Sequence, residues 1–308
     1  MVSAVGDLEQ VVRSVTYVTD RRGFVRLHAP MDDPSSNDEL TYDDRFDEWS
    51  GCVGPARLLL LQPLRPQLRT EASLAKERIG WAMEPLMWLV ERAAVSGIPA
   101  DEWGTSPEFT AIGNARFGWE PQPESLEGDR GFGEMDSLHL LARDIGAIER
   151  TGRRDTITWA GRVLLGDPPR LWRAAARTPT STGGFFAAQC ELIFASLLQQ
   201  VTLDQNEAGI RLGSAIIEAA GGEDYLDRVD ETELSRGEAV VQLVTLGMQM
   251  TRTLGTALRM FDDGPRPGEV RPWLNDVGRA TAIQALRASL EAGEFVPTLG
   301  PPLEGAWN

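Results

Sequence analysis

The chain has few of the residues that most catalytic and metal centres require. Its 308 residues include two histidines, two cysteines and a single lysine, Lys76. Neither His28 nor His139 has a partner at zinc-ligand spacing, and there is no Walker A loop or Gly-x-Ser-x-Gly elbow. Cys52 and Cys190 lie far apart, so a disulfide framework is not indicated. These absences predict a protein without catalytic residues, metal or cofactor, in which His139 is a partly buried or surface helix histidine and not a ligand or a catalytic base.

Long apolar runs are also missing. The most apolar short run, Leu58–Leu61, has four residues, whereas a membrane-spanning helix needs about 20. The N-terminus carries acids early and no apolar segment, unlike a signal peptide. The net charge of −16 favours solubility and opposes non-specific binding to nucleic acid or to an anionic membrane. We therefore expect a soluble, cytoplasmic protein that does not bind membranes.

The first 70 residues combine a predicted β-hairpin with an acidic segment. Two β-prone runs between Val15 and Leu27 flank an Asp-Arg-Arg-Gly turn, a pattern typical of a hairpin. Residues 32–48 contain eight acids but lack the spacing of an EF-hand loop. We interpret them as a solvated loop in preference to a cation-binding loop. Three prolines interrupt the apolar stretch Pro55–Pro66, which we expect to act as a linker.

Helical periodicity dominates the remainder of the chain. In Glu71–Val95, apolar residues recur every three to four positions, and Pro85 is expected to kink or divide this helix. Gly97 follows as a C-terminal stop. Further helices are predicted at Phe185–Val201, Gln205–Ala220 and Ala239–Met260, the last of them behind a capping box of Ser235 and Glu238.

The stretch Leu138–Arg177 has a pattern of its own. A predicted helix, Met135–Glu149, runs into the charged turn Arg150–Arg154 and then into a β-branched run. A new helix begins at Ala160 and ends before a Gly-Asp-Pro-Pro segment, after which Arg170–Arg177 is again helical. A helix, a basic hairpin and a second helix are typical of a winged helix, a fold that serves both as a DNA reader and as a protein-docking module.

This pattern occurs a second time in Leu254–Leu286. In the first copy Thr158 precedes a Gly-Arg pair at the start of a helix, and in the second copy Asn275 does the same. The glycine would let the helix approach the hairpin closely, because it has no Cβ atom. We interpret the two stretches as an internal repeat, with a chance likeness of two helix starts as the alternative.

Several of these segments resemble a large actinobacterial protein family. They are Gly97-Ile98-Pro99, Leu141–Glu149, and Gly161-Arg162 followed by Leu165–Arg173, which matches the family's GRxLLxDPxxLWR segment. Some members are fused to a plasmid-type Orf domain. The resemblance covers about residues 75–177 and extends more weakly to 288; it implies a helical, winged-helix-like body. It transfers no site residue, because no activity is known for that family, and the usual basic wing tail is missing here.

The predicted fold is therefore mainly α with small β-wings. We expect a helical body with one or two winged-helix-like units and an N-terminal β-hairpin region. Three regions are predicted: residues 1–70 with the hairpin and the acidic loop, residues 71–180 with the first winged-helix-like unit, and residues 181–308 with the second unit and a tail.

Arginines form the one local cluster of positive charge that stands out in the sequence. Residues 138–177 hold eight arginines against four acids, whereas residues 254–287 hold five against four. Only the first copy is therefore a candidate surface for a polyanion or an acidic partner. The predicted contact residues are Arg150, Arg153, Arg154, Arg162, Arg170 and Arg173.

Two functions are compatible with this sequence. The favoured hypothesis is a non-catalytic protein-interaction or adaptor protein built on winged-helix-like units, because the chain is strongly acidic and rich in apolar helices. The alternative is a DNA-associated winged-helix regulator that uses the basic wing at residues 150–173. An enzyme has no supporting set of residues, and association into a homo-oligomer stays open.

Overall fold

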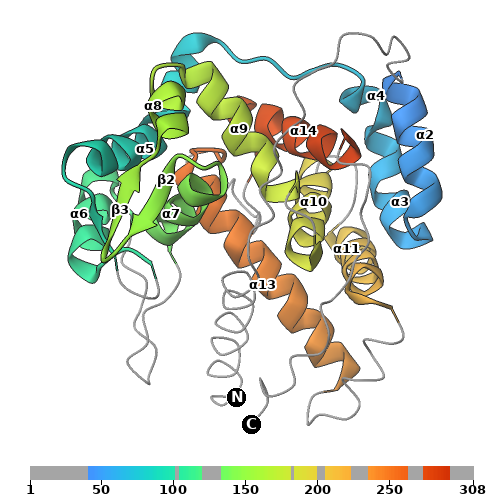
Figure 1. Ribbon diagram of the computed structural model, residues 1–308. Helices are drawn as coiled ribbons and strands as arrows, with labels where there is room; N and C mark the ends of the chain where they lie inside the picture. The colour runs from blue at the N-terminus through green and yellow to red at the C-terminus, as the bar shows by residue number, and fades with distance from the viewer. Residues whose placement is uncertain are drawn as a thin grey trace.

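The computed structural model describes residues 41–100, 104–119, 133–181, 184–199, 205–222, 235–262 and 273–291. Within these ranges the protein is mainly helical, and its only sheet has three antiparallel strands at one side of the helical body (Figure 1). The predicted mainly helical fold is confirmed at this level. The predicted hairpin between Val15 and Leu27 lies outside the described residues.

The acidic segment is a helix from residue 42 onward, so its prediction as a solvated loop is wrong there. Thr41 caps helix α2, Tyr42–Cys52, by accepting the backbone N–H of Asp44 at 3.2 Å, and the Asp44 carboxylate accepts the N–H of Thr41 at 3.0 Å. Phe46 and Trp49 of this helix are buried. Apolar residues at this spacing form an amphipathic helix even where most of its neighbours are charged.

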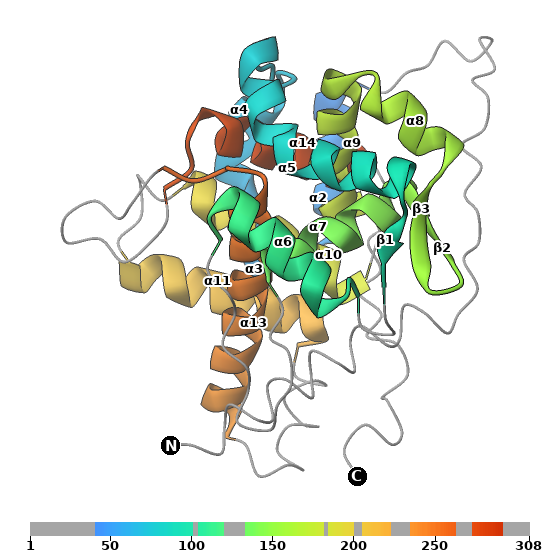
Figure 2. The ribbon, with the colours of Figure 1, turned by 90° about the vertical axis from the view of Figure 1, so that its left-hand side faces the viewer.

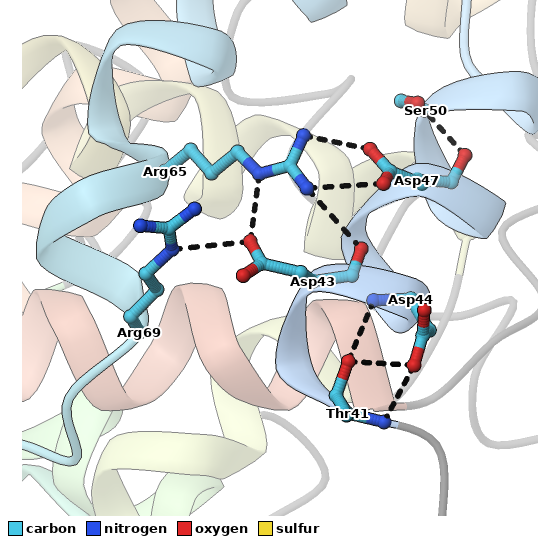
Figure 3. Close-up of polar contacts among 7 residues, drawn as sticks. All are labelled: Thr41, Asp43, Asp44, Asp47, Ser50, Arg65 and Arg69. Carbon is cyan, nitrogen blue, oxygen red and sulfur yellow. Dashed lines mark hydrogen bonds and ion pairs between the residues drawn. The ribbon is translucent and has the colours of Figure 1, made fainter.

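Two acids of α2 attach it to the next helices. Asp43 accepts hydrogen bonds from Arg65 at 2.9 Å and from Arg69 at 3.1 Å, and Asp47 accepts from Arg65 at 2.7 Å (Figure 3). Asp43 and Asp47 are four residues apart, and so are Arg65 and Arg69. The two members of each pair therefore project to the same side. Two of the acids predicted to meet only solvent, Asp43 and Asp47, are therefore neutralised by arginines.

The predicted linker Pro55–Pro66 is helical, and its prolines divide it into short segments. Each of these segments has a proline in its first turn, where the missing N–H costs no hydrogen bond. Glu218 accepts the free backbone N–H groups of Ala56 at 3.0 Å and Arg57 at 3.1 Å. The segments are α3, Pro55–Leu61; η1, Gln62–Leu64; and α4, Arg65–Leu68.

Helix α5, Lys76–Val95, continues through Pro85 without a break, so the predicted division does not occur. It starts five residues after the predicted start at Glu71, and Gly97 follows it with a φ of +69°. Ser106 then caps helix α6, Pro107–Phe117, by accepting the N–H of Phe109.

The sheet joins the end of α5 to the hairpin after helix α7, Glu134–Asp144. Its strand order is β1-β3-β2, and all pairs are antiparallel. Helix α7 ends five residues before the predicted Glu149, because Gly146 turns the chain into β2 with a φ of +68°. The strands are β1, Ile98–Pro99; β2, Ile148–Thr151; and β3, Arg154–Ile157; helices α8, Trp159–Leu165, and α9, Pro168–Ser181, follow.

Four further helices complete the body. Helix α10 packs against α9, α11, α13 and α14 (Figure 2), and its Glu191 forms a buried ion pair with Arg57 of α3 at 2.7 Å. The predicted capping box of Ser235 and Glu238 is confirmed at the start of α13. No single helix within the described ranges is long and apolar enough to cross a membrane. The helices are α10, Gly184–Leu198; α11, Gln205–Ala220; α13, Arg236–Ala257; and α14, Asp276–Glu291.

The two stretches of the proposed repeat have the same backbone hydrogen bonds where the chain enters α8 and α14. In the first junction, residues 145–162, the N–H of Thr158 bonds to the carbonyl of Ala147 at 3.0 Å. In the second junction, residues 258–262 and 273–279, the N–H of Asn275 bonds to the carbonyl of Met260, also at 3.0 Å. Each capping side chain then accepts the N–H of the residue three positions later, at 2.9 Å in both cases. The likeness found in the sequence is therefore a likeness of structure at these two junctions.

A glycine lies at the closest point of each junction, as the sequence predicts. A Cβ atom on Gly161 would overlap the carbonyl oxygen of Ala147, and one on Gly278 would overlap that of Met260. The second junction differs in one turn: Arg259 takes the place of Gly146 and adopts a φ of +53°. Its guanidinium donates to the Trp81 carbonyl at 2.8 Å, which ties the junction to α5.

We expect Gly161→Ala and Gly278→Ala each to lower the free energy of unfolding by about 2–3 kcal/mol or more, because the methyl group displaces backbone rather than a flexible side chain. Gly80→Ala is the matched control. It has open space inside α5 and should raise stability by roughly 0.5–1 kcal/mol. Urea unfolding followed by circular dichroism measures all three. Equal stability of the junction variants and the wild type would contradict the close-approach account.

Candidate interaction site around helices α7 to α9

Helix α7 precedes the hairpin, where a winged helix would carry its DNA-reading helix. It packs against α5, α6, α9 and α13. The side chains from Met135 to His139 are all buried, as are Leu141 and Ala142. Only Asp144, at its last position, is exposed. The helix therefore offers no exposed polar face that could read base edges.

His139 of α7 is fully buried, and not partly buried or on the surface as predicted, and it has a hydrogen-bond partner. Its Nε2 lies 2.7 Å from Oδ2 of Asp155 on β3, and both side chains are buried. Arg150, opposite Asp155 in the hairpin, donates from Nε to Oδ1 at 2.8 Å. Although burial alone would raise it, the pKa of Asp155 is held below its usual range by the hydrogen bonds from His139 and Arg150.

This arrangement gives Arg150 and Arg154 structural partners within the chain. Arg150 pairs with Asp155, and Arg154 donates from Nη1 to the carbonyl of Ser96 at 2.7 Å. Ser96 is the C-cap of α5, where a cation meets the negative end of the helix dipole. Arg153, at the hairpin turn, is exposed. Of the three hairpin arginines, Arg153 is thus the best placed to contact another molecule.

The other predicted arginines lie on α8 and α9, beside an open groove of about 460 Å³. Arg170, Arg173 and Arg177 of α9 line it together with Trp159, the first residue of α8. Arg162 is exposed on α8 but does not line the groove. Figure 1 shows α8 at the outer edge of the molecule, above the sheet.

Trp159 is the most exposed aromatic residue of this region, with 80% of its surface accessible. Ala160 and Val163, partly buried, lie beside it in the groove and give the floor an apolar character. A large aromatic side chain exposed next to a groove marks a surface suited to binding.

The positive charge of this surface is mostly not neutralised by the chain itself. Among the described residues, no carboxylate forms an ion pair with Arg162, Arg170 or Arg173. Arg177 pairs with Glu291 of α14. We call Trp159, Arg162, Arg170 and Arg173 the α8–α9 surface.

The sequence analysis named three of these four residues and missed Trp159, as well as Arg177 in the groove. Both had a signal. Arg170, Arg173 and Arg177 are spaced by three and four residues, which predicts one helix face. Trp159 follows the capping residue Thr158, where its side chain projects from the first turn.

Metal-ligand clusters and nucleophilic thiols can be assessed in the part of the chain that the structure covers. There, no group of three or more histidine, cysteine, aspartate or glutamate side chains could hold a metal ion. The thiol of Cys190 is buried, and burial raises its pKa to about 12, so it is a poor nucleophile at neutral pH.

We expect Asp155→Asn to lower the free energy of unfolding at pH 7 by about 3–5 kcal/mol, because it breaks a buried charged network. A carboxylate with a lowered folded-state pKa stabilises the fold above its unfolded pKa of about 4 and loses that contribution as the pH falls further. The wild type should therefore lose stability below pH ~4 more steeply than Asp155→Asn. Urea unfolding at pH 2.5 to 7 tests this, with Glu149→Gln, an exposed carboxylate of the same hairpin, as control. Parallel pH profiles of wild type and Asp155→Asn would refute it.

Comparisons with protein-family models, with curated proteins and with solved structures find no match for this chain. The α8–α9 surface is accordingly identified from its own geometry: an exposed tryptophan, an apolar groove and arginines that no carboxylate of the described residues pairs with.

Proposed function

We propose that the protein is a non-catalytic adaptor that binds an acidic protein partner through the α8–α9 surface, on a scaffold of two winged-helix-like units. Support for the scaffold comes from the first unit, where α5, α6 and α7 precede a hairpin and the strands run in the order β1-β3-β2. The second unit is supported by the shared hydrogen bonds of the two junctions.

The burial of α7 is the observation that carries this proposal. A winged helix that reads DNA places the polar face of this helix in the major groove. Here α13 and three other helices cover it, and its one histidine is held inside by Asp155. Its position in the core argues against the DNA-associated alternative and leaves the outer helices as the surface for binding.

Charge supports an acidic partner. The chain carries a net charge of −16, so its overall field repels nucleic acid and acidic proteins alike, and only a local positive surface can attract either of them. The α8–α9 surface is a local exception, since its three arginines have no carboxylate partners within the described residues. Complementary charge across an interface speeds association and fixes orientation. Arg153 on the hairpin is the residue that most favours the DNA alternative.

Affinity capture from an extract of the source organism, followed by mass spectrometry, tests the proposal. We expect a partner that the wild type retains and that Arg170→Glu/Arg173→Glu loses, because two charges of the interface are reversed. The matched control is Arg252→Glu/Arg279→Glu, which makes the same charge change at exposed arginines of α13 and α14 and should retain the partner.

A mobility shift with random duplex DNA tests the alternative. We expect no shift at moderate salt. A salt-sensitive shift that Arg153→Glu abolishes would replace the adaptor proposal by the DNA-associated one.

A further inference from the structure

We propose that the groove between α8 and α9 binds an acidic amphipathic helix of the partner, with one apolar side chain seated beside Trp159 and carboxylates paired with Arg170 and Arg173. The inference rests on the proposed function and specifies the partner segment that this surface recognises.

The groove has the two parts that such a helix needs. Its floor contains Ala160 and Val163 of α8, and its α9 side carries Arg170, Arg173 and Arg177. A helix that binds in a groove presents apolar anchors at three- and four-residue spacing and charged residues along the flanks of its apolar face. The arginines of α9 share this spacing, so a row of carboxylates along a partner helix can meet them in sequence.

The second junction indicates what covers such a face. There, Val277 and Ala280 of α14 occupy the positions of Ala160 and Val163, counted from the shared Gly-Arg pair. Both are buried, with 0% and 6% of their surface exposed, and α14 packs along helices α9 and α10. The equivalent face is therefore covered by helices of the chain itself in the second unit and is open in the first.

The position of Trp159 shows the same contrast. Its counterpart at the start of α14 is Asp276, which pairs with Arg78 of α5. The second unit thus carries an acid that an internal helix satisfies, whereas the first carries an exposed aromatic residue next to arginines. At this position the first unit therefore has an exposed apolar side chain in place of a paired acid. An external helix with an apolar anchor requires such an exposed side chain.

A single-stranded nucleic acid is the competing occupant, because arginine and tryptophan also bind phosphates and bases. Single-strand tracks use several aromatic platforms along a continuous basic groove. In this groove Trp159 is the one aromatic residue among the lining side chains, and the floor is aliphatic. These features favour a peptide with an apolar anchor.

Selection from a display library of random peptides of about 16 residues tests the inference with the full chain. We expect enriched peptides to be acidic, with apolar residues at three- and four-residue spacing, and to become more helical on binding. In anisotropy titrations of the enriched peptides, Trp159→Ala and Val163→Asp should each weaken binding at least about tenfold. Ile210→Ala, which removes another exposed apolar side chain, and Arg279→Glu, the counterpart of Arg162, should bind like the wild type.

The possible failures are distinguishable. If partner capture depends on Arg170 and Arg173 but the enriched peptides lack helical spacing, the helix inference is overturned and the adaptor proposal stands. If no peptide is enriched and capture is indifferent to these arginines, both fail. Binding of oligo-dT that Trp159→Ala abolishes, without peptide enrichment, would assign the groove to single-stranded nucleic acid.

Discussion

The close approach of two backbone segments at each junction determines how the helix that follows it is placed. Gly161 lies against the carbonyl of Ala147, and Gly278 against that of Met260, at points where any side chain would overlap backbone. The first contact holds α8 at the rim of the sheet and directs the chain into α9. The second places α14, which packs along α9 and α10 in the core. The same local geometry thus produces one exposed helix and one buried helix.

The contacts of the arginines separate those that stabilise the fold from those that are available to bind a partner. Asp155 collects His139 and Arg150 into one buried network, and Arg154 binds the end of α5. These arginines stabilise the fold. The arginines further along the chain, on α8 and α9, have no such partners among the described residues, and they surround an exposed tryptophan. We therefore propose the helices after the hairpin, rather than the hairpin itself, as the binding surface.

Much of this architecture could be predicted from local sequence signals. The boundaries of α11, the capping box of α13 and the repeated Gly-Arg helix starts follow from short-range rules, and all three occur in the structure. The many acids of residues 32–48 predict a solvated loop and do not indicate α2, although Phe46 and Trp49 have the spacing of a helix.

Other features depend on residues distant in sequence, and no local pattern reports them. The burial of α7 arises from α13, which follows it by about a hundred residues. The partner of His139 is Asp155 of β3, which no helical or strand periodicity connects to α7. For the same reason, the six predicted arginines could be named but not divided into structural and exposed ones.

Amide hydrogen exchange of the protein, free and bound to its captured partner, tests the central claim most directly. The account predicts that binding slows exchange in Trp159–Arg177 and leaves the hairpin Ile148–Ile157 unchanged. Slowed exchange in the hairpin with no change across α8 and α9 would contradict it.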